Sequence, residues 1–138
     1  MSKKFNCILL VDDNPDDNFY HERVIKKTHA ADEVVVKQSG QDALDFLVSD
    51  KDADDSRPDL ILLDINMPNM NGWEFIDAYS RLDKDVQCKG VIVMLTTSDN
   101  PDDIERAKNA PVPVGYKVKP LSRQDLEELM TRHSQGEL

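Results

Sequence analysis

Five polar side chains that can bind a metal ion or a phosphate follow short hydrophobic runs. They are Asp12, Asp13, Asp64, Thr96 and Lys119, and the runs cover residues 8–11, 60–63, 91–95 and 112–118. If these runs are parallel strands of one sheet, the side chains emerge at its carboxyl edge, where open α/β sheets bind their ligands. Crowded carboxylates repel one another, and a hard divalent cation such as Mg²⁺ relieves that repulsion through oxygen ligands. The pattern therefore indicates a metal-assisted phosphoryl site.

Strand-like runs alternate with helical periods along the whole chain, which is typical of βαβ folds. The expected strands are residues 6–11, 34–37, 59–63, 90–95 and 113–118. The expected helices are about 14–30, 41–49, 72–82, 100–109 and 122–133. Asn14-Pro15 and Asn100-Pro101 each combine an N-cap residue with a proline at the first helical position. In the first helix, Phe19 is expected to face inward. The pattern predicts a (βα)5 domain.

The composition limits the class of protein. The 138 residues suit one domain, and 17 basic against 27 acidic side chains give a net charge of −10. Such a surface repels nucleic acid and anionic membranes, and no dense basic run offsets it. The run that ends at Val11 is too short for a signal peptide or a membrane span. Cys7 and Cys88 lack metal-ligand spacing, so a buried free thiol at Cys7 and a cytoplasmic location are expected.

Four motifs together resemble the receiver domain of bacterial two-component response regulators, especially the stand-alone, chemotaxis-type receivers. The motifs are Asp12-Asp13, Leu63 to Gly72, Leu95 to Ser98, and Gly115 to Pro120. They occur in the order of the family, and the resemblance covers about residues 5–134 of a single domain spanning 1–138, with 135–138 as a frayed tail. It implies a doubly wound, flavodoxin-like fold with a five-stranded parallel sheet in the order 2-1-3-4-5, flanked by five helices.

The resemblance implies that Asp64 is the phosphoacceptor. A carboxylate is a weak nucleophile, so phosphoryl transfer to it depends on positioning and on charge neutralisation. Asp12, Asp13 and Asp64 would hold Mg²⁺ together with the backbone carbonyl of Asn66, and the metal would let an anionic nucleophile meet an anionic donor.

The resemblance also implies roles for Thr96, Lys119 and Tyr116. The Thr96 hydroxyl and the Lys119 ammonium would bind the phosphoryl oxygens, and the peptide bond between Lys119 and Pro120 would be cis. Tyr116 matches the switch aromatic that moves inward when the threonine is drawn to the phosphate. Ser98 departs from the family in a position that tunes the lifetime of the phosphoryl group, so the lifetime is left open.

The implied function is that of a single-domain response regulator of a phosphorelay. A sensor histidine kinase or a histidine phosphotransfer protein would donate the phosphoryl group. The output would be protein–protein contact at the face of the fourth helix, the fifth strand and the fifth helix. Such a protein is not an enzyme in the ordinary sense, although it catalyses its own phosphorylation and dephosphorylation. Neither nucleic acid nor a membrane is an expected partner.

Two rival functions fit parts of the pattern. A Mg²⁺-dependent phosphatase or phosphotransferase of the haloacid dehalogenase type also forms an aspartyl phosphate. Its pattern, however, has a second Asp two residues after the nucleophile, whereas Asp12 is followed by Asp13 and Asn14. A flavodoxin-like FMN carrier would need a Ser/Thr/Gly-rich phosphate loop after the first strand, where residues 14–17 are acidic.

Two further features are expected to be unremarkable surface. The Asp-rich residues 50–57 are predicted to form a solvated connection, with a cation or partner site as the alternative. His21, His29 and His133 have no partner spacing and are predicted to be surface histidines of helices.

Overall fold

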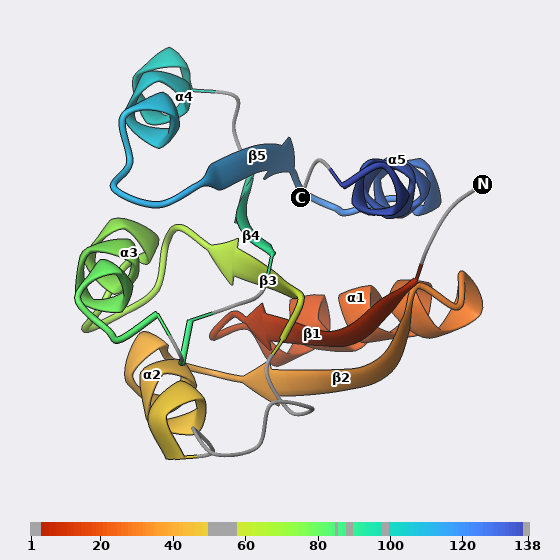
Figure 1. Cartoon of the computed structure of the whole chain (residues 1–138), viewed down its shortest axis with the longest axis horizontal. Helices are drawn as coiled ribbons and strands as arrows, with labels where there is room; N and C mark the ends of the chain where they lie inside the picture. Colours follow the sequence, from red (N-terminus) through yellow and green to blue (C-terminus); the bar gives the residue numbers. More distant parts are fainter. Residues whose placement is uncertain (1–3, 50–57, 85, 88–89, 98–99, 137–138) are drawn as a thin grey trace.

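Strands and helices alternate along the chain in a computed structural model that describes residues 4–49, 58–84, 86–87, 90–97 and 100–136 (Figure 1). The strands are β1 Phe5–Val11, β2 Ala31–Lys37, β3 Leu60–Asp64, β4 Val91–Thr96 and β5 Val114–Val118. The helices are α1 Pro15–Lys27, α2 Gly40–Ser49, α3 Gly72–Ser80, α4 Pro101–Lys108 and α5 Arg123–Ser134. Every predicted element is present, and β2 begins three residues before the predicted start at Val34.

The five strands form one parallel sheet in the order β2-β1-β3-β4-β5, which confirms the predicted doubly wound fold. The chain first moves from β1 outward to β2, then returns past β1 to β3. The strand order therefore reverses between β1 and β3, whose register aligns Val11 with Leu63. The residues that directly follow Val11 and Leu63 lie at the edge where such sheets bind ligands.

Helices cover both faces of the sheet (Figure 1). Leu9, Ile61 and Met94 belong to the core cluster under α2, α3 and α4, whereas their neighbours in sequence, such as Ile8 and Leu62, belong to the cluster under α1 and α5. Since β3 and β4 are buried at every position, they consist of almost continuous hydrophobic runs. This two-sided burial is the reason that the central strands could be predicted from the sequence.

Side-chain caps define where four helices begin at the carboxyl edge, and in α4 the Asn100 side chain accepts the N–H of Asp102. Asn14 accepts hydrogen bonds from the backbone N–H groups of Asp16 and Asp17, as its N-cap position predicted. Ser122 forms a capping box with α5. A further capping box joins Asn71 to Glu74 at the start of α3. These caps satisfy backbone donors that a helix start leaves without partners.

The prediction of surface histidines is wrong for His21 and His133. His21 is 2% exposed, and its Nε2 accepts the N–H of Leu121 at 3.2 Å. His133 stacks on Phe5 with ring centroids 4.5 Å apart. His29 is exposed, but it lies beyond the end of α1 with a positive φ of 54°. The expected inward orientation of Phe19 is also wrong, since it is 66% exposed.

Cys7 is a buried free cysteine, as predicted. Burial raises the pKa of its thiol to about 12, and the charges of Glu33 and Asp59 act in the same direction. The thiol is therefore protonated and unreactive near neutral pH. The predicted connection at 50–57 lies outside the described residues. No helix among the described residues is long and apolar enough to cross a membrane.

Candidate phosphoacceptor and metal site

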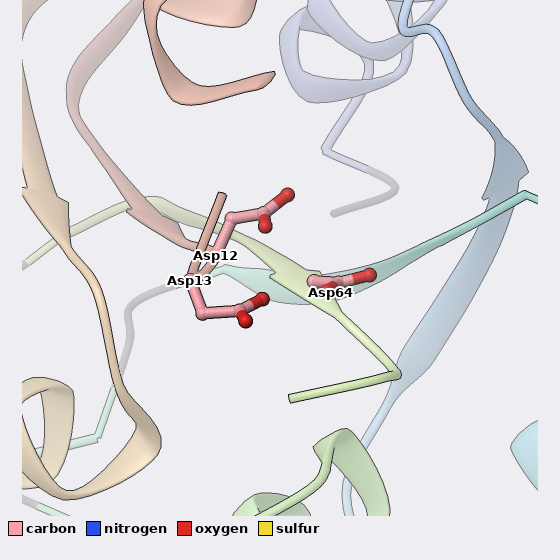
Figure 2. A group of neighbouring side chains, drawn as sticks. All are labelled: Asp12, Asp13 and Asp64. Atoms are coloured by element: carbon pink, nitrogen blue, oxygen red, sulfur yellow. The ribbon is translucent and has the colours of Figure 1, made fainter. Parts of the chain in front are cut away.

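Three carboxylates meet at the ends of β1 and β3 (Figure 2). One oxygen from each of Asp12, Asp13 and Asp64 lies within 4.8 Å of the others. Asp12 and Asp64 are buried, whereas Asp13 is exposed. Like charges this close destabilise one another unless a cation compensates them. Their oxygen-only chemistry fits a hard divalent cation such as Mg²⁺.

Asp12 is held in place by hydrogen bonds to its side chain and to its backbone. Its Oδ1 accepts the N–H of Asn14 at 3.0 Å, and its own N–H donates to the carbonyl of Lys37 at 3.1 Å. The buried side-chain amide of Asn18 donates to the Asp12 carbonyl at 2.8 Å. Asp12 is therefore oriented before any ligand binds.

The Lys119 ammonium contacts two carboxylates of this cluster. Its Nζ lies 2.7 Å from Asp12 Oδ2, 2.9 Å from Asp17 Oδ2 and 3.4 Å from Asp64 Oδ1. The Lys119 side chain is only 9% exposed, so solvent screens its ion pairs with the buried Asp12 and Asp64 weakly. Its backbone N–H donates to the Thr96 carbonyl at 2.6 Å, and the bond to Pro120 is cis, as the sequence implied.

The two charged groups affect each other's ionisation. Burial and, to a smaller extent, the charge of Asp12 raise the pKa of Asp64 to about 6, even though Lys119 and the backbone N–H of Asn66 act to lower it. Burial acts to lower the Lys119 pKa, but hydrogen bonds to Asp12 and Asp17 outweigh it, so that pKa is raised above its ordinary value. Lys119 therefore stays charged whenever the site is ionised.

The loop after Asp64 folds back tightly over the end of β3. The N–H of Gly72 donates to the Ile65 carbonyl at 2.8 Å, which closes the loop that contains Asn66. A Cβ atom at position 72 would lie 2.9 Å from Ile65 Cα and 3.0 Å from the Asp64 carbonyl oxygen. This contact with backbone explains why a glycine occupies the position. Asn66 itself is exposed beside the carboxylates.

Thr96 and Tyr116 lie on the neighbouring strands. Thr96 is 2% exposed and follows Leu95, the residue of β4 that aligns with Asp64. Tyr116 on β5 aligns with Met94, is half-buried and packs against the core cluster under α2, α3 and α4. The structure thus places the predicted switch residue one strand away from the predicted hydroxyl donor.

Sequence reasoning missed the contribution of α1. Asp17 contacts Lys119, Asn18 contacts the backbone of Asp12, and His21 contacts the backbone just beyond Lys119. The buried residues of α1 are Asn18, His21 and Ile25, a helical spacing that could have marked this face. Two of the three are polar, so the hydrophobic periodicity of the sequence does not mark this face.

A model of the response regulator receiver domain matches residues 8–131 of the chain. The chain belongs to this family. The probable methanogenesis regulatory protein FilR2 of Methanothrix harundinacea is 31% identical over 121 residues, which cover 87% of this chain and 76% of FilR2. Response regulator Rcp1 of Synechocystis is 34% identical over 99 residues, which cover 70% of this chain and 65% of Rcp1.

A solved structure of a two-component response regulator from Cytophaga hutchinsonii superimposes with a TM-score of 0.87 at 32% identity, covering 96% of this chain and 99% of the other. The chain is therefore a receiver domain of two-component signalling, and receiver domains act as signalling proteins. It spans less than two thirds of the length of Rcp1, so the activity of that whole protein does not carry over.

The raised pKa of Asp64 predicts how pH affects the metal-free receiver. Its folded-state pKa of about 6 lies above the ordinary value of 3.8, so the folded protein binds this proton more tightly than the unfolded chain does. The resulting stabilisation is present at acidic pH and is lost as pH rises from about 4 to about 6. In EDTA near neutral pH, Asp64→Asn should therefore stabilise the fold by about 1–2 kcal/mol after solvent screening.

Melting temperatures measured across this pH range test the effect. Asp16→Asn, which removes an exposed acid from the same edge, serves as the control for net charge. If Asp64→Asn and Asp16→Asn show the same pH profile as the wild type, burial and crowding do not destabilise the Asp64 carboxylate.

Proposed function

We propose that Asp64 accepts a phosphoryl group in a Mg²⁺-dependent reaction, from a sensor histidine kinase or a histidine phosphotransfer protein. The observation that carries the proposal is the convergence of the Asp12, Asp13 and Asp64 carboxylates, with the Lys119 ammonium 3.4 Å from Asp64. Within a receiver domain, this arrangement supplies a nucleophile, a metal-binding edge and a fixed positive charge in a single site.

Asp12, Asp13, Asp64 and the backbone carbonyl of Asn66 are the groups that we assign to Mg²⁺. Bound Mg²⁺ would neutralise negative charge on the phosphoryl oxygens. Two carboxylates on consecutive residues at the end of β1 and a third on β3 supply oxygens from two strands, which suits a cation that prefers oxygen ligands.

Asp64 would act as the nucleophile. An oxygen of its carboxylate forms a bond to phosphorus while the bond from phosphorus to the donor's histidine nitrogen breaks. Lys119 lies 3.4 Å from Asp64 and keeps its charge, so it can pair with a phosphoryl oxygen as the Asp64 carboxylate is consumed. Loss of the phosphoryl group to water would then reset the protein.

Thr96 and Tyr116 would transmit the phosphorylation state. A shift of the Thr96 hydroxyl toward the phosphoryl group would open space, and Tyr116 would rotate into it. Tyr116 lines a cavity of about 780 Å³ between α4, β5 and α5, together with Lys108, Lys117 and Arg132. A change there would alter contacts with a protein target, and neither nucleic acid nor a membrane is part of the proposal. We place this exchange in the cytoplasm and assign it to a receiver core of about residues 5–134.

Labelling with acetyl phosphate tests the acceptor. With Mg²⁺, wild-type protein should gain one phosphate by intact mass, and EDTA should prevent the gain. Asp64→Asn should gain none, because the amide is not a nucleophile, whereas Asp16→Asn should label like the wild type. Full labelling of Asp64→Asn would contradict the assignment. Steady turnover of a generic phosphate ester would instead favour the rival Mg²⁺-dependent phosphatase or phosphotransferase.

Tyr116→Ala tests the proposed switch. The variant should label on Asp64 as the wild type does, because the proposal assigns Tyr116 neither to Mg²⁺ nor to the phosphoryl group. Beryllofluoride, a phosphoryl mimic, should change the amide NMR shifts of α4 and β5 much less in the variant than in the wild type. Val118→Ala is the matched control, since Val118 lies on the same strand with an exposed side chain. Equal shift changes in Tyr116→Ala and wild type would contradict the switch role.

A further inference from the structure

Asp17 lies on α1, outside the group of residues assigned to the metal or to phosphate, yet its carboxylate contacts Lys119 at 2.9 Å. We propose that Asp17 is a positioning residue that competes with the phosphoryl group for Lys119 and so weakens phosphorylation of Asp64. The proposal rests on the proposed role of Asp64 as acceptor.

The Lys119 ammonium donates hydrogen bonds to Asp12 and to Asp17. An ammonium has three N–H donors, and three carboxylates lie within 3.4 Å of its nitrogen. The distances are unequal: Asp12 and Asp17 are at 2.7 and 2.9 Å, and Asp64 is at 3.4 Å. Lys119 is thus held closer to Asp12 and Asp17 than to the proposed acceptor.

Asp17 differs from the other two partners of Lys119. Asp12 is a proposed metal ligand, and Asp64 is the proposed acceptor. The charges around both residues therefore change when Mg²⁺ and the phosphoryl group bind. Asp17 belongs to neither group. Its backbone N–H donates to Asn14 Oδ1 at 3.2 Å, and its position in the first turn of α1 favours a negative charge. Asp17 therefore remains a partner for Lys119 after the phosphoryl group arrives.

Two effects of Asp17 act in the same direction. For Lys119 to follow a phosphoryl oxygen on Asp64, its ion pair with Asp17 must lengthen or break. The Asp17 carboxylate also adds negative charge next to the place where an anionic group must bind. Because the Asp17 side chain is 39% exposed, solvent screens both effects, and the expected change on its removal is modest.

Beryllofluoride affinity at saturating Mg²⁺ measures this competition directly, without turnover. Asp17→Asn should bind beryllofluoride about two- to fivefold more tightly than the wild type, the range that a partly exposed ion pair supports. Asp17→Glu retains the charge and should stay close to the wild type. Asp16→Asn removes the neighbouring charge of the same helix turn and should produce a clearly smaller change than Asp17→Asn.

Two results would overturn the proposal while leaving Asp64 as the acceptor. Equal affinities for Asp17→Asn and Asp16→Asn would reduce the effect to net charge, and weaker binding by Asp17→Asn would mean that Asp17 delivers Lys119 to the phosphoryl group. If wild-type protein binds Mg²⁺ in calorimetric titration but does not bind beryllofluoride, the acceptor role itself is contradicted, and the role of Asp17 with it.

Discussion

The site depends on the ion pairs that the Lys119 ammonium forms with the surrounding carboxylates. Asp12, Asp13 and Asp64 each place an oxygen within 4.8 Å of the others, and Asp17 adds a fourth carboxylate 2.9 Å from the Lys119 nitrogen. In the metal-free protein, Lys119 is the cation that contacts three of these four acids. Because it is almost buried, its charge compensates theirs under weak solvent screening. Without it, folding would force several carboxylates together against their mutual repulsion.

The central sheet and helix α1 together bring Lys119 to that position. The parallel sheet aligns the ends of its strands, so that Asp64 pairs in register with Leu95 and Thr96 with Val118. Directly after β5, the backbone N–H of Lys119 donates a hydrogen bond to the Thr96 carbonyl at the end of β4. From the other side, α1 holds the ammonium through Asp17 and the following backbone through His21. The site is therefore a joint product of the central sheet and of one helix packed against it.

The role of His21 follows from its surroundings. Burial lowers the pKa of this imidazole, and the charge of Lys119 lowers it further, while Asp12 and Asp17 act to raise it. A neutral ring keeps a nitrogen free to accept the Leu121 N–H, and a protonated ring could not. A positive charge on His21 would also face Lys119. The lysine that compensates the acids thus helps to keep the neighbouring histidine neutral.

The sequence predicted the parts of this structure that hydrophobic patterns encode. Strands buried on both faces are nearly continuous hydrophobic runs, and the polar residue after each run marks the carboxyl edge, which placed Asp12, Asp64 and Thr96. The orientation of α1 was not predicted, because its buried face consists largely of polar residues. Phe19 was expected inside on grounds of hydrophobicity, but it is exposed while Asn18 is buried.

The sequence did not predict which face of α1 is buried, and this has a physical reason. Asn18 and His21 are buried because their hydrogen-bond partners come from the end of β1 and from the loop before α5, the latter 100 residues away in the chain. A buried polar group is tolerated only where such a partner exists. Local patterns carry no information on distant partners, so polar residues on a helix read as solvent-facing. The same limit hid the contact between Asp17 and Lys119.

The free energy of unfolding of Lys119→Met in EDTA tests most directly whether this ammonium holds the acidic site together. The variant should lose about 3 kcal/mol relative to the wild type, because removing one member of a buried ion pair leaves the others uncompensated. Mg²⁺ should restore part of the loss. Lys117→Met is the matched control, since Lys117 lies on β5, two residues before Lys119, and pairs with the exposed Glu128. An unchanged or higher stability of Lys119→Met in EDTA would contradict the central role of Lys119.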